Sequence, residues 1–126
     1  MSKLENDYVR LELIDGILHV TFKKNAYITL QIAKEIVNQR LIFMGSNNLP
    51  SLGKDEGLKG MDKEARDYLS SEEGIKQLKA SALIVSSVFN KLLANFFIKV
   101  NFISLKIPVR VFTEENEALQ WLEGFK

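Results

Sequence analysis

The sequence predicts an α/β fold with a mixed β-sheet of about five strands and helices packed against it. Three observations lead to this class: an amino-terminal β-hairpin that can be aligned residue by residue, apolar runs of strand length, and segments of helical periodicity between those runs. Strands separated by helices pair in parallel through right-handed crossovers, so the hairpin supplies the antiparallel part. With 126 residues the chain suits one hydrophobic core, and we expect a single domain over residues 1–126.

Composition narrows the classes of function. The chain has no cysteine, which excludes disulfides, thiolate metal sites and cysteine nucleophiles. Its 17 basic and 16 acidic residues are interspersed, so we expect no broad surface for nucleic acid. The amino terminus lacks the apolar part of a secretory signal, and no apolar run approaches the roughly 20 residues that cross a bilayer. We therefore expect a cytoplasmic protein without a transmembrane segment.

Residues 8–22 predict a β-hairpin around Asp15-Gly16, a pair that tolerates the positive φ of a two-residue turn. Counting outward from the turn places these apolar pairs on one face: Leu13 with Leu18, Leu11 with Val20, and Val9 with Phe22. The other face pairs Glu12 with His19 and Arg10 with Thr21. We expect this second face to be the wetter one.

A helix is expected from the N-cap Thr29 to about Met44, with Gly45 ending it. Its inward side is formed by Ile32, Ala33, Ile36, Val37, Leu41 and Met44. The next segment, 46–60, contains a proline and three glycines, so we expect at most a short strand between Leu49 and Lys54.

Two short helices are expected after this segment. Asp62 would cap the first, Lys63 to Leu69, with Ala65 on its inward side. The run Ser70-Ser71-Glu72-Glu73 places a serine three residues before a glutamate, and this capping box predicts a second helix towards Leu78.

The stretch from Ser81 to Phe102 is expected to be the centre of the fold. Residues 82–85 form an apolar run of strand length, and residues 88–100 have helical periodicity. Ser86-Ser87, between them, would cap this helix. A second strand is expected from Pro108 to Phe112. Thr113 would then cap a last helix with an apolar side formed by Ala118, Leu119, Trp121, Leu122 and Phe125.

Three stretches together resemble the small STAS-like, or SpoIIAA-like, proteins of bacteria: MDKEARDYLSSEEG, ALIVSSVFNKLLANFF and PVRVFTEENEALQWL. These proteins are related in fold to the anti-sigma-factor antagonists and, more distantly, to the CRAL-TRIO lipid carriers. The resemblance covers most of the chain and implies a scaffold that binds a partner. It implies neither a cofactor nor a reaction.

Residue 63 separates this chain from the antagonists. Their helix begins with Asp-Ser-Ser-Gly, and a partner kinase phosphorylates the first serine, whereas this chain has Asp62-Lys63-Glu64-Ala65. Because Lys63 has no hydroxyl to accept a phosphoryl group, we expect the phospho-switch to be absent. The strand expected after Leu49 also departs from the resemblance, since it lacks a continuous apolar run.

Few residues could support chemistry. His19 is the sole histidine, and we interpret it as a strand residue of the wetter face because no nucleophile can be placed beside it. We find no spacing typical of metal ligands. Glu114, Glu115 and Glu117 fit the positive end of the last helix. Ser86 and Ser87 could hold an anion at a helix N-terminus, although capping alone explains them.

One apolar group could have a function beyond the core. It comprises Phe89, Leu93, Phe96, Phe97 and Phe102. These residues could be core, the wall of a pocket for an apolar ligand, or a surface for a protein partner or a second copy of the chain. Our leading hypothesis is a non-catalytic binding module that acts through protein contacts or self-association. The alternative is a carrier of a lipid or another apolar molecule, and an enzyme is the least favoured class.

Overall fold

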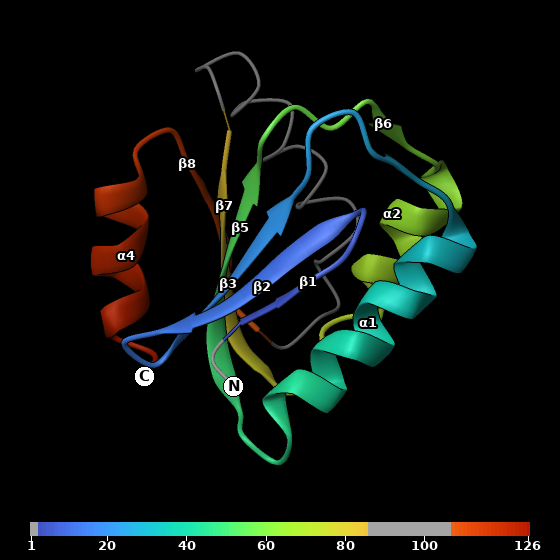
Figure 1. The fold of residues 1–126 in the computed structure, drawn as a ribbon. Helices are drawn as coiled ribbons and strands as arrows, with labels where there is room; N and C mark the ends of the chain where they lie inside the picture. Colours follow the sequence, from blue (N-terminus) through green and yellow to red (C-terminus); the bar gives the residue numbers. More distant parts are fainter. Residues whose placement is uncertain (1–2, 86–106) are drawn as a thin grey trace.

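The computed structural model describes residues 3–85 and 107–126, and its centre is a mixed six-stranded sheet (Figure 1). The strand order is β1-β2-β3-β5-β7-β8, with helices α1 and α2 on one face and α4 on the other. The predicted α/β class is therefore confirmed. The described elements are β1 (Lys3–Glu5), β2 (Val9–Ile14), β3 (Ile17–Phe22), β4 (Tyr27–Ile28), α1 (Leu30–Met44), β5 (Leu49–Asp55), β6 (Gly60–Met61), α2 (Lys63–Leu69), β7 (Leu78–Ile84), β8 (Val109–Phe112) and α4 (Glu115–Glu123).

The sheet has one more strand than the five expected. Strand β1 pairs antiparallel with β2 at one edge, and the sequence analysis did not predict it. Strands β3, β5, β7 and β8 then run parallel to one another. A separate two-residue parallel pair joins β4 to β6.

The register of the hairpin is confirmed at every predicted pair, including Val9 with Phe22 and Glu12 with His19. The expectation of a wetter second face is wrong for β3, where Ile17, His19 and Thr21 are all buried. This face and α4 together form an apolar cluster, which comprises Ile17, Leu52, Ala80, Ala82, Phe112, Ala118 and Leu122. Both faces of β3 are therefore interior.

Helix α1 begins and ends as predicted. The hydroxyl of Thr29 accepts a hydrogen bond from the backbone N–H of Ile32 at 3.3 Å, and Gly45 takes the positive φ of 62° that a helix-ending glycine allows. Its inward side also contains Arg40, which is 4% exposed and was not predicted to be buried.

The strand expected between Leu49 and Lys54 does form, as β5, but it is not short, because it is seven residues long and lies between β3 and β7. Pro50 has no N–H to donate, and the pairing with β7 shifts register at this point, between Leu49 and Ser51. Gly53 suits its place because a Cβ there would lie 2.9 Å from the Leu83 side chain of β7. The two residues that weakened the prediction are thus accommodated by local features.

The second short helix, predicted from the capping box after Ser70, does not form. Residues 71–77 make turns instead, although the Ser71 hydroxyl accepts from the Gly74 N–H at 3.2 Å as a cap would. The guanidinium of Arg40 donates to the carbonyl oxygens of Gly74 at 3.1 Å and of Lys76 at 3.0 Å. These carbonyls serve tertiary bonds rather than a helix, and β7 begins at Leu78.

The carboxyl-terminal part follows the prediction closely. Strand β8 and helix α4 lie where they were expected, with the N-cap at Glu114 rather than Thr113. The helix predicted over residues 88–100, and the cap expected at Ser86 and Ser87, lie outside the described residues.

Gly74 provides a test of this packing. An ideal Cβ at Gly74 would overlap the carbonyl oxygens of Tyr68 and Leu69, and these backbone atoms cannot move aside as a side chain can. We expect Gly74→Ala to lower the free energy of unfolding by about 1–3 kcal/mol, measured by urea denaturation.

The matched control is Gly124→Ala. A Cβ at Gly124 would have its nearest contact at 3.6 Å, and the residue has an ordinary right-handed helical conformation. We expect a change within about 0.5 kcal/mol. Equal effects of the two substitutions would show that the turn at Gly74 is not tightly packed.

Candidate functional site

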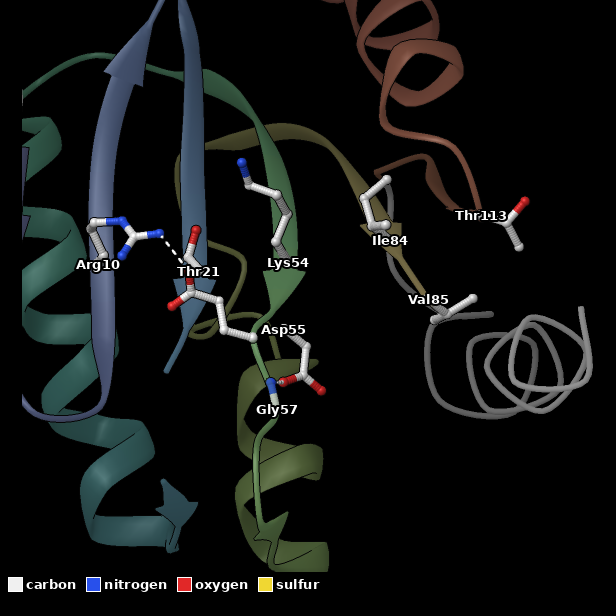
Figure 2. Close-up of a pocket in the computed structure, with 9 residues that line it drawn as sticks. Arg10, Thr21, Lys54, Asp55, Gly57, Ile84, Val85 and Thr113 are labelled. Atoms are coloured by element: carbon white, nitrogen blue, oxygen red, sulfur yellow. Dashed lines mark hydrogen bonds and ion pairs between the residues drawn. The ribbon is translucent and has the colours of Figure 1, made fainter. Parts of the chain in front are cut away.

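A cavity of about 610 Å³ lies at the carboxyl ends of β3, β5 and β7 (Figure 2). This is the edge of an open α/β sheet at which ligands commonly bind. Its polar lining consists of Arg10, Thr21, Lys54, Asp55, Glu56 and Thr113, and its aliphatic lining of Ile84 and Val85.

Three of the polar residues form a row across neighbouring strands. Thr21 on β3 is the partner of Arg10 on β2 and also of Lys54 on β5. Directly paired residues point to the same face, so all three side chains lie on the face that carries α4. Figure 2 shows Thr21 between the other two.

The two cations of this row are held differently. Arg10 donates to Glu56 at 3.0 Å and to Glu12 at 3.3 Å, and the hydrogen bond with Glu56 is the main reason that the pKa of Arg10 is raised. Lys54 has a looser ion pair, with 3.5 Å between its Nζ and the Glu115 carboxylate of α4. Arg10 is therefore tightly bonded, whereas Lys54 can change partner at small cost.

The loop after β5 is fixed by its own hydrogen bonds. One carboxylate oxygen of Asp55 accepts from the N–H groups of Gly57, at 2.8 Å, and Leu58, at 2.6 Å. Gly57 has a φ of 122°, which suits glycine, and its carbonyl accepts from the N–H of Asn25. The rim of the cavity is thus fixed at Asp55 and Gly57.

Two buried polar atoms have no hydrogen-bond partner among the described residues: Thr21 Oγ1 and His19 Nδ1. Burial lowers the pKa of His19, and the nearby charge of Lys54 lowers it further, while the carboxylates of Glu115, Glu12 and Asp15 oppose the shift. The imidazole is consequently neutral near pH 7. It faces the α4 side of the sheet rather than water, which corrects the interpretation of His19 as a residue of the wetter face.

The structure shows the surroundings of Lys63. Its side chain is 75% exposed and pairs with Asp67 one turn further along α2, with 2.9 Å between Nζ and Oδ2. Asp62 occupies the N-cap position but makes no capping bond, and its carboxylate accepts from the Tyr27 hydroxyl at 2.6 Å instead. The residue that the resemblance matches to the phosphorylated serine, Lys63, thus lies at the exposed start of α2.

The other predicted site residues lie outside the described residues. They are Ser86, Ser87, Phe89, Leu93, Phe96, Phe97 and Phe102. The sequence analysis in turn missed the cavity. Pairing Arg10 with Thr21 gave two of the three residues of the row, but adding Lys54 required knowing that β5 lies beside β3.

Two features are absent from residues 3–85 and 107–126. These residues contain no group of three or more histidine, aspartate or glutamate side chains placed to share a metal ion. None of their helices has the length and apolar character needed to cross a membrane.

Comparison with known proteins supports the fold. A family model described as Domain of unknown function (DUF7793) matches residues 11–126. A solved structure of an uncharacterised protein from the DUF3478 family with a SpoIIAA-like fold, from Shewanella loihica PV-4, has a TM-score of 0.61 at 16% identity, covering 94% of this chain and 98% of that one.

A second solved structure, a protein of unknown function from Arthrobacter sp. FB24, is 28% identical over 90% of this chain and 97% of its own. Its TM-score is 0.34. No curated protein matches the sequence. The predicted SpoIIAA-like fold is confirmed by the first of the two structures.

Thr21→Val should stabilise the protein. Valine has the shape of threonine and removes a buried hydroxyl that has no partner among the described residues. We expect the free energy of unfolding to rise by about 1 kcal/mol in urea denaturation. The matched control, Thr29→Val, removes the cap of α1 and should lower it by about 1 kcal/mol. A fall in stability for Thr21→Val would mean that its hydroxyl has a partner after all.

The pH dependence of stability should report the burial of His19. In the folded state the pKa of His19 is lowered below its ordinary value of 6.5. The neutral imidazole therefore contributes stability that is complete above pH 6.5 and is lost as the pH falls from there through the pKa of the folded state. We expect wild type to lose more stability than His19→Leu between about pH 7.5 and pH 5.5, since this is the pH range of an imidazole. His19 is the sole histidine, so parallel pH curves would refute its burial.

Proposed function

This chain belongs to the family described as Domain of unknown function (DUF7793), and we propose that it is a non-catalytic binding module of the bacterial cytoplasm. We propose further that it is a single domain over residues 1–126 that acts through protein contacts, including self-association. The observation that carries the proposal is the SpoIIAA-like fold over almost the whole chain. A fold provides a scaffold and does not determine a reaction, so the function depends on the side chains that the scaffold carries.

The described side chains support binding rather than proton transfer. In the cavity, Glu56 is paired with Arg10, and Asp55 is bonded to the N–H groups of its own loop. The one imidazole of the sequence is buried beneath this face. General acid–base catalysis needs a group that is within reach of a substrate and has a pKa near the working pH. The two carboxylates are bonded within the protein and the imidazole is buried, so none of the three is free to reach a substrate.

The proposal includes the absence of the antagonists' phospho-switch. At the position that the resemblance assigns to the phosphorylated serine, this chain has Lys63, which carries an ammonium group paired with Asp67. The nearest serine hydroxyls along the chain are engaged, since Ser70 Oγ donates to the Arg66 carbonyl and Ser71 Oγ donates to the Tyr68 carbonyl. Binding would therefore be independent of phosphorylation at this helix.

The alternative of a lipid carrier rests on the aromatic group Phe89, Phe96, Phe97 and Phe102, which lies outside the described residues. The cavity formed by the described residues has four charged side chains in its lining, those of Arg10, Lys54, Asp55 and Glu56, beside the aliphatic Ile84 and Val85. A carrier would need a largely apolar chamber. The described residues thus favour the module over the carrier.

Native mass spectrometry of the purified protein tests the proposal. We expect masses of the chain alone and of a dimer, with the dimer fraction rising with protein concentration, and no stoichiometric lipid. A lipid that co-purifies at one copy per chain would refute the module and support the carrier. A chain that stays monomeric at every concentration would remove self-association from the proposal.

A further inference from the structure

The Thr21 hydroxyl is the starting point for a ligand site. Thr21 lines the cavity, its side chain is 2% exposed, and Oγ1 has no hydrogen-bond partner among the described residues. A buried hydroxyl left in this state lowers the stability of the protein. A ligand that bonded to it would recover this cost, so the site gains from being occupied.

The neighbours of Thr21 decide which kind of group it would bind. Arg10 and Lys54 flank it on the same face of the sheet. Both side chains carry N–H donors and no acceptor, and a threonine hydroxyl can also donate. A group placed among them must accept hydrogen bonds, and a negatively charged oxygen does so most strongly.

Lys54 is the cation that is available. Arg10 is already bonded to Glu56 and Glu12, whereas the ion pair between Lys54 and Glu115 spans 3.5 Å and joins partly exposed side chains. Such a partly exposed ion pair contributes little to stability. An incoming anion can therefore replace Glu115 as the partner of the lysine.

The rest of the lining restricts the ligand further. Ile84 and Val85 lie across Lys54 from Arg10 and offer an aliphatic wall (Figure 2). Asp55 and Glu56 add two negative charges to the lining, which disfavour a doubly charged ligand such as a phosphate. The volume of about 610 Å³ is within the usual range for a small-molecule site.

We propose that this cavity is a binding site for a small monocarboxylate with a short aliphatic chain. The carboxylate would accept hydrogen bonds from Lys54 Nζ and Thr21 Oγ1, and the aliphatic chain would lie against Ile84 and Val85. Arg10 holds Glu56 and Glu12 in place and shapes one end of the site. This site goes beyond the proposed function, which concerns protein contacts and names no ligand for the cavity.

Titration of the ¹⁵N-labelled protein with hexanoate, followed by two-dimensional NMR, tests the proposal. Saturable shifts are expected at the backbone amides of Thr21, Lys54 and Val85. The tail without the charge is tested with 1-hexanol and a doubly charged anion with inorganic phosphate, and both should bind at least about tenfold more weakly. Hexanol or phosphate binding as tightly as hexanoate, or no saturable shift with hexanoate, would overturn the proposal.

Variants complete the test. Lys54→Gln and Thr21→Val should each weaken hexanoate binding by about tenfold or more, since each removes one hydrogen bond to a charged group. Lys59→Gln removes an exposed lysine outside the cavity lining and should bind as wild type does. Thr21→Val is expected to be more stable than wild type, so its loss of binding could not be ascribed to unfolding. Unchanged affinity in Lys54→Gln would refute the site.

Discussion

The position of β5 in the middle of the sheet is the constraint on which the remaining structure depends. This strand pairs in parallel with β3 on one side and with β7 on the other, so its backbone groups are satisfied without water. The segments that flank the start of β5 are joined by hydrogen bonds. The side-chain amide of Gln77 donates to the carbonyls of Gly45 and Asn47, and the backbone carbonyl of Gln77 accepts from the Leu49 N–H. The end of α1 and the start of β7 are thereby fixed to the same point.

Arg40 strengthens this junction at a cost. Its guanidinium is buried, donates to two carbonyls of the 71–77 turn, and has no carboxylate partner among the described residues. Burial lowers the pKa of Arg40 to about 10, so the side chain stays charged at neutral pH. A buried charge is tolerated when it is hydrogen-bonded. Here the bonds from Arg40 hold residues 71–77 in a turn that leads into β7, in place of the predicted helix.

The same placement of β5 creates the candidate site. The carboxyl ends of β3, β5 and β7 meet at one edge, where Thr21 and Lys54 lie side by side on the face that carries α4. The elements on that face cover β3 closely enough to bury His19 and Thr21, yet leave a polar atom of each without a partner among the described residues. Stability is given up at this edge, and binding sites are where proteins commonly accept such a loss.

Local patterns in the sequence determined the parts of the fold that rest on neighbouring residues: the hairpin register around Asp15-Gly16, the limits of α1 between Thr29 and Gly45, and the last strand and helix. Long-range pairing decided the rest. Pro50 and Gly53 reduce strand propensity locally, but β3 and β7 hold β5 extended from both sides. The capping box of Ser70 and Glu73 did not start a helix, because residues 71–77 are held in turns by bonds from Arg40, more than 30 residues earlier. The cavity could not be predicted for the same reason, since Arg10, Thr21 and Lys54 meet only when three strands have been placed next to one another.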